Sequence, residues 1–102
     1  MITAQQAEAL QQSLQGSFIS EKEAKARANR FILDNLRDGF SAGRPRVVVI
    51  GQEAAWSVPV QFAFPERVFG EVGEIVIQAV SGSILGFTPP AELYRNAKQF
   101  LT

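Results

Sequence analysis

Residues 55–64, AWSVPVQFAF, decide the fold, because apolar side chains alternate in them with smaller or polar ones. This period of two is typical of a β-strand with one buried face. Pro59, in the middle of the stretch, has no N–H to donate to a neighbouring strand. The strand is therefore predicted to lie at a sheet edge or to be paired through a non-donating position, and an exposed edge there would be a dimerisation or peptide-docking site. The alternating apolar positions are Trp56, Val58, Val60, Phe62 and Phe64.

Three further strands are predicted around this one. Residues 46–51 precede it, after turn material that contains Pro45. Residues 72–80 and 83–87 follow it, after a connection over residues 65–70, and the Ser81-Gly82 turn joins them as a hairpin. The sequence thus predicts a four-stranded antiparallel sheet.

Helical spacing precedes the sheet. Residues 3–15 are predicted to form a short helix capped by Thr3 and stopped by Gly16. This helix is marginal alone in water, so it is expected to dock on its own domain or on a second subunit. Its narrow apolar stripe consists of Ala4, Ala7, Leu10 and Leu14.

A second helix is predicted to begin at Ser20 and to end by Gly39. Ser20 can accept a hydrogen bond from the backbone N–H of Glu23, while the Glu23 carboxylate returns to the N–H of Ser20. A single α+β domain over residues 1–102 is therefore expected, with two N-terminal helices and a short C-terminal helix that starts at Thr88-Pro89-Pro90. The predicted buried stripe of the helix that begins at Ser20 consists of Ala24, Ala28, Phe31, Ile32 and Leu36.

Composition limits the chemistry. The 102 residues include ten Lys plus Arg, ten Asp plus Glu, no His and no Cys. Zinc, iron–sulfur and haem sites built on those ligands are excluded, together with Cys nucleophiles and Ser-His-Asp triads. The balanced charge argues against nucleic acid as a partner. We expect no enzymatic activity and no cofactor.

The N-terminus lacks the basic start and apolar run of a signal peptide, and no stretch approaches the roughly 18 apolar residues of a membrane-spanning helix. The sequence therefore favours a cytoplasmic protein without a membrane partner.

The acidic residues do not suggest a metal site. Glu71 and Glu74 lie three apart on a predicted strand and point to opposite faces, as edge-guarding charges do. Asp34 and Asp38 share a helix face with arginines nearby, which is typical of a solvated, salt-bridged surface. No metal is assigned.

Residues 74–85, EIVIQAVSGSIL, resemble the closing hairpin of PepSY-like domains: an apolar strand, a small turn ending in Ser-Gly and a short apolar strand. Residues 56–60, WSVPV, resemble the preceding central strand. The resemblance covers about residues 20–87 and implies a PepSY/cystatin-like α+β fold with a non-catalytic binding or inhibitory role. A second resemblance, to small bacterial proteins with a Trp-x-Val-Pro segment and a Thr-Pro helix start, implies no activity.

Two functions remain open at this point. In the first, the chain is a protein-interaction module that binds another protein or itself, as a homodimer, through Leu10, Leu14, Pro59 and Tyr94. In the second, it binds a small apolar ligand in a pocket between the sheet and the helix that begins near Ser20. That pocket would be lined by Phe31, Trp56 and Phe62, although alternating aromatics are more often simple core.

Overall fold

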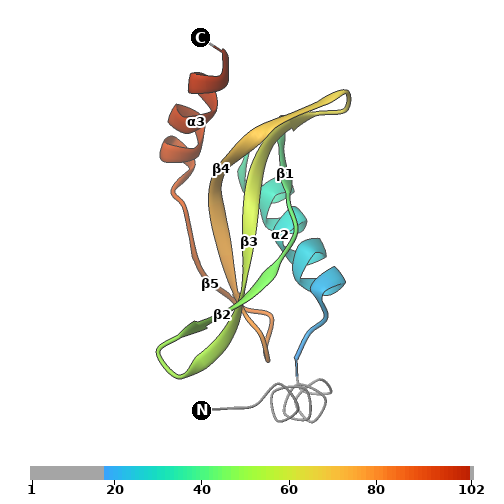
Figure 1. Cartoon of the computed structure of the whole chain (residues 1–102), viewed down its shortest axis with the longest axis vertical. Helices are drawn as coiled ribbons and strands as arrows, with labels where there is room; N and C mark the ends of the chain where they lie inside the picture. The colour runs from blue at the N-terminus through green and yellow to red at the C-terminus, as the bar shows by residue number, and fades with distance from the viewer. Residues whose placement is uncertain (1–17, 102) are drawn as a thin grey trace, which may run out of the picture.

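The computed structural model describes residues 18–101, which form an α+β fold around one antiparallel sheet (Figure 1). This confirms the predicted class. The helix predicted over residues 3–15, with Leu10 and Leu14, lies outside the described residues. In chain order the elements are α2 (Glu21–Asn35), β1 (Phe40–Ala42), β2 (Arg46–Ile50), β3 (Glu53–Phe64), β4 (Arg67–Gln78), β5 (Ile84–Phe87), α3 (Pro90–Lys98) and the 3-10 turn η1 (Gln99–Leu101).

The strand β3 is central. It pairs with β4 on one side and with β1 and then β2 on the other, while β5 lies beyond β4. Of the two positions predicted for Pro59, the sheet edge is therefore wrong and pairing through a non-donating position is confirmed. The carbonyl of Pro59 accepts a hydrogen bond from the N–H of Gly43 at 2.8 Å. Because the N and O of a strand residue point to the same side, the missing N–H faces the break between β1 and β2, where no ladder bond is lost.

The sheet has five strands instead of four, and β4 is longer than predicted. Residues 67–70, expected as a connection, pair with the end of β3. Two register shifts interrupt the pairing of β3 with β4, one between Val60 and Gln61 and one between Phe62 and Ala63. Such bulges bend a strand and increase its twist, which accounts for the curl of the sheet in Figure 1.

Both helices contribute to one core on the same face of the sheet. From α2, Ala24 and Ala28 are fully buried and Ile32 nearly so. The small side chains of the two alanines allow α2 to approach β3 closely. From α3, Leu93 and Ala97 join the same cluster. A Cβ atom on Gly70 of β4 would lie 2.7 Å from the Phe100 ring, so the end of the chain packs directly on that strand.

The predicted helix starts are confirmed in part. Ser20 caps α2 by accepting from the N–H of Glu23 at 3.0 Å. The Glu23 carboxylate, however, pairs with Arg27 at 3.0 Å instead of returning to Ser20. Thr88 does not cap α3, whose cap is Pro89 without a side-chain bond. The Thr88 hydroxyl accepts a hydrogen bond from the N–H of Glu74 instead.

Candidate functional site

Side chains from α2, from α3 and from the loop before α3 bond parts of the exposed sheet edge. Beside β1, the N–H of Ala42 donates to Oδ1 of Asn29 on α2 at 2.9 Å. Where β4 extends past β5, Asn96 of α3 donates to the carbonyl of Val72 at 2.8 Å. Thr88 accepts from the N–H of Glu74 on the same edge at 3.0 Å. These bonds satisfy backbone groups that would otherwise attract another strand.

Among residues 18–101, no side chain covers the outer edge of β2 in this way. The carbonyl of Ala54 accepts from the N–H of Ala79, so the peptide groups of Ala54 point toward β4 and away from β2. Val49, opposite Ala54, therefore belongs to a non-hydrogen-bonded pair, and its N–H and C=O point outward. The same holds for Val47, two residues earlier. Within residues 18–101, no group bonds these outward peptide groups.

The side chains of β2 are also exposed. Val49 is 72% exposed, Val47 53% and Ile50 49%, and the pairing of β2 with β3 is regular along its whole length. In Figure 1, β2 and the turn that follows it project from the body of the molecule. A regular, apolar, unprotected edge strand is a template for pairing with another chain.

The other free edge strand, β5, is a weaker template. It has four residues and a register shift in its pairing with β4. Short edge strands and bulges are common means by which proteins discourage edge pairing. The edge of β2 is therefore the candidate site.

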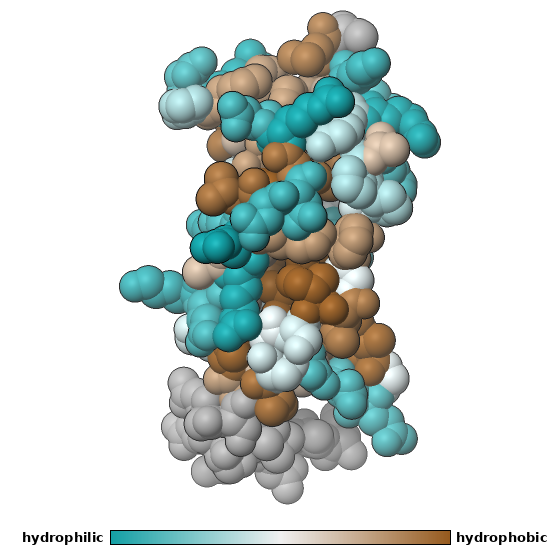
Figure 2. Space-filling model, turned by 180° about the vertical axis from the view of Figure 1, so that it is seen from behind, coloured by the Kyte–Doolittle hydropathy of each residue, from teal (hydrophilic) through white to brown (hydrophobic). Residues whose placement is uncertain are grey.

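The candidate site continues into an apolar row on the helix-facing side of the sheet. Register places Val47 beside Trp56, Trp56 beside Ile77 and Ile77 beside Ile84. Ile77 is fully buried, whereas the two ends of the row, Val47 and Ile84, are exposed. Figure 2 shows hydrophobic side chains reaching the surface in the middle and lower part of the molecule. The row gives an added strand apolar surface beside the open edge.

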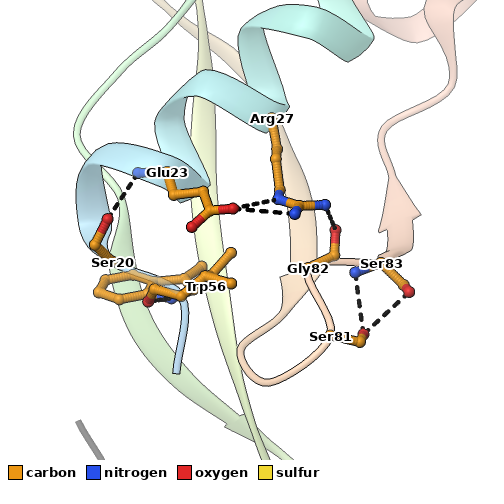
Figure 3. A network of polar contacts seen from close by, with 8 residues as sticks. Ser20, Glu23, Arg27, Trp56, Ser81, Gly82 and Ser83 are labelled. Atoms are coloured by element: carbon orange, nitrogen blue, oxygen red, sulfur yellow. Dashed lines mark hydrogen bonds and ion pairs between the residues drawn. The ribbon is translucent and has the colours of Figure 1, made fainter. Parts of the chain in front are cut away.

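A polar network fixes this end of the sheet (Figure 3). The indole N–H of Trp56 donates to the carbonyl of Ile19 at 3.1 Å. Arg27, already paired with Glu23, donates to the carbonyl of Gly82 in the β4–β5 turn at 3.3 Å. These bonds tie β3, the strand next to β2, to the segment just before α2, and the β4–β5 turn to α2 itself.

The structure does not gather the three predicted pocket residues around one cavity. The Phe31 ring lies 4.8 Å from that of Phe87. Trp56 and Phe62 stand six positions apart on β3, which is about 20 Å of extended chain. Phe62 instead packs among other rings, which belong to Phe40, Phe64, Phe69 and Phe100.

The predicted interaction residues within residues 18–101 make internal contacts. The Tyr94 hydroxyl accepts from the N–H of Arg37 at 3.3 Å, and its ring lies 5.6 Å from that of Phe40. Pro59 is half-buried on the sheet face opposite the core. Val47 and Val49 were not predicted as site residues, because a run of valines in a strand usually signals a buried strand.

A polar groove of about 450 Å³ lies on the sheet face opposite the core, next to α3. Ser57 donates to Oε2 of Glu74 at 2.6 Å within it. Among the described residues no group of acidic side chains could hold a metal ion. The groove is lined by both arginines and glutamates, so it presents no single sign to a charged ligand. Its lining consists of Arg44, Arg46, Ser57, Pro59, Glu71, Val72, Gly73, Glu74, Thr88, Glu92 and Asn96.

Comparison with protein-family models, curated proteins and solved structures found no match to the chain. Across the described part of the chain, neither helix has the length and apolar character needed to cross a membrane. The open edge of β2 is therefore the feature on which a functional proposal rests.

Proposed function

We propose that this protein is a non-catalytic protein-interaction module that binds an extended segment of polypeptide along β2. The observation that carries this proposal is the pair of outward-facing residues Val47 and Val49, whose peptide groups and side chains are both exposed. In strand addition, main-chain hydrogen bonds supply affinity and alternate side chains supply specificity. The edge of β2 offers both.

Two further observations support the proposal. Helix-borne Asn29 and Asn96 close other stretches of the sheet edge, so this fold does use polar side chains to protect its strands. In β2, Arg46 is the only charged residue, and there is no Lys or Pro. An edge whose only guarding charge lies at its first residue suits a strand that is used for binding. The order of one helix followed by a curled antiparallel sheet is also the arrangement that a PepSY-like module implies.

The proposal is tested by selecting displayed random peptides of about ten residues against the protein. The decisive variant is Val49→Pro, which removes an outward N–H and leaves the β2–β3 hydrogen bonds in place, because Val49 does not bond to β3. We expect peptides that bind the wild type and lose at least tenfold in affinity for Val49→Pro. The matched control Val49→Thr keeps both the N–H and the branched shape, and it is expected to keep most of the binding.

Folding of each variant is checked by circular dichroism and by the fluorescence of Trp56, the only tryptophan. Selected peptides that bind wild type and a folded Val49→Pro equally would overturn the proposal. The absence of any enriched extended peptide, in a selection at a protein concentration where the chain is monomeric, would also overturn it.

A further inference from the structure

We infer that the strand that occupies the edge of β2 is β2 of a second copy of this chain, antiparallel to the first and centred on Val48. This inference rests on the proposed function and names its partner. The two sheets would then form one continuous sheet across a twofold axis, which is the isologous contact typical of homodimers.

The positions of the outward peptide groups select this register. Centring on Val48 places Val47 of one copy opposite Val49 of the other, and each such pair exchanges two hydrogen bonds. A register centred on Val47 would place Val49 opposite Pro45, which has no N–H. A register centred on Val49 would place Val47 opposite Gly51, in the turn beyond the strand. Only the central register uses every outward group of both strands.

The side chains are self-complementary in the same register. On the helix-facing side, Val47 and Val49 of the two copies lie next to one another and cover surfaces that are 53% and 72% exposed in one chain. On the other side Val48 meets its own copy, and Arg46 stands opposite Ile50. No like charges lie opposite each other in this register, so the pairing has none of the electrostatic repulsion that destabilises strands with like charges in facing positions.

The register is tested by disulfide trapping in a chain that contains no native cysteine. In Val48→Cys the two thiols face each other across the axis in a non-hydrogen-bonded pair, where Cα atoms are about 4.5 Å apart and within the range of a disulfide. In the matched control Val47→Cys, the equivalent Cα atoms are offset by two residues and lie roughly 8 Å apart, which is too far. We expect Val48→Cys to form a covalent dimer at least tenfold faster in a glutathione redox buffer.

Association of the cysteine-free wild type is measured by sedimentation equilibrium over a range of protein concentrations. We expect the mass to rise from one chain to two, and Val49→Pro to raise the dissociation constant at least tenfold. A wild type that stays monomeric up to millimolar concentration would overturn the inference, as would equal trapping of the two cysteine variants. A dimer that is unaffected by Val49→Pro would show that the copies associate elsewhere and would overturn it too.

These outcomes separate the inference from the proposed function. If the copies do not pair but selected peptides still require Val49, the partner is another polypeptide and the interaction module stands. If no peptide depends on Val49 and the copies do not pair through β2, the proposed function falls together with the inference.

Discussion

The substitution Gly82→Ala tests the network that anchors the end of the sheet next to β2. Gly82 is buried, has a φ of +76° and lies under Arg27, so an added Cβ atom would be 2.6 Å from the guanidinium carbon. Gly51→Ala is a matched control. Gly51 has a φ of +63°, but it is exposed and has no atom within 4 Å of the added Cβ. Both variants place alanine in the left-handed region, and only one displaces a neighbour.

The two variants should differ in free energy of unfolding by the contribution of the Arg27 contacts. Left-handed backbone costs an alanine about 1–2 kcal/mol, which both variants pay in the free energy of unfolding. Gly82→Ala also pushes Arg27 away from the carbonyl it bonds at 3.3 Å, a hydrogen bond worth about 1 kcal/mol. The Arg27–Glu23 pair is about half exposed, so its disturbance adds little. We expect Gly82→Ala to lose about 1 kcal/mol more than Gly51→Ala.

The assay is urea unfolding followed by Trp56 fluorescence and far-ultraviolet circular dichroism. With a denaturant slope of about 1–3 kcal/mol/M, the extra loss moves the midpoint by roughly 0.5 M relative to Gly51→Ala. In an Arg27→Ala background this extra loss should disappear. Equal losses for the two glycine variants, or an extra loss that persists without Arg27, would refute the assignment of a stabilising contact to Arg27.

Two further predictions concern the core and the protected edge. Leu93→Ala should lower the free energy of unfolding by about 2–5 kcal/mol, because Leu93 is 2% exposed and its removal leaves a cavity between α3 and Gly73; a loss below about 1 kcal/mol in urea unfolding would contradict this. Asn29→Ala should cost about 1–3 kcal/mol, because it leaves the N–H of Ala42 unsatisfied, whereas Asn29→Asp keeps an acceptor and should recover most of that stability. Equal losses for the two Asn29 variants in the same assay would count against a protective bond.

Local pattern predicted the elements that are long and regular. Alternation over residues 55–64 gave β3, and Ser20 with Glu23 gave the start of α2. The strand β1 was not predicted, because its three residues are too few to show an alternation of apolar and polar side chains. The first half of β4 was not predicted because its bulges interrupt the alternation, and Gly70 and Gly73 resembled turn residues.

The position of Pro59 shows where sequence reasoning stops. The nitrogen of a proline in a strand has no hydrogen to donate, so it must not face a carbonyl group that needs a hydrogen bond. A sheet edge meets this requirement, and so does a break in the adjoining strand. The break between β1 and β2 lies at residues 43–45. It becomes visible only when the strands on either side of it are paired with β3, which is a non-local contact. Likewise, the exposure of Val47 and Val49 follows from β2 having a single neighbour, which no local pattern encodes.

The open edge of β2 and the protected edge of β1 belong to the same side of β3, and this contrast is the strongest reason to regard β2 as a binding strand. Asn29 reaches Ala42 from α2, so the fold supplies a protecting group where the helix runs beside the sheet. Past the break at residues 43–45, three valines continue, and Arg46 at the start of β2 is the only charged residue of the strand. An unprotected strand of this composition favours association at high protein concentration. Pairing in one closed register satisfies this edge in both copies and ends growth of the sheet through β2 at two copies, because β2 then has no free side.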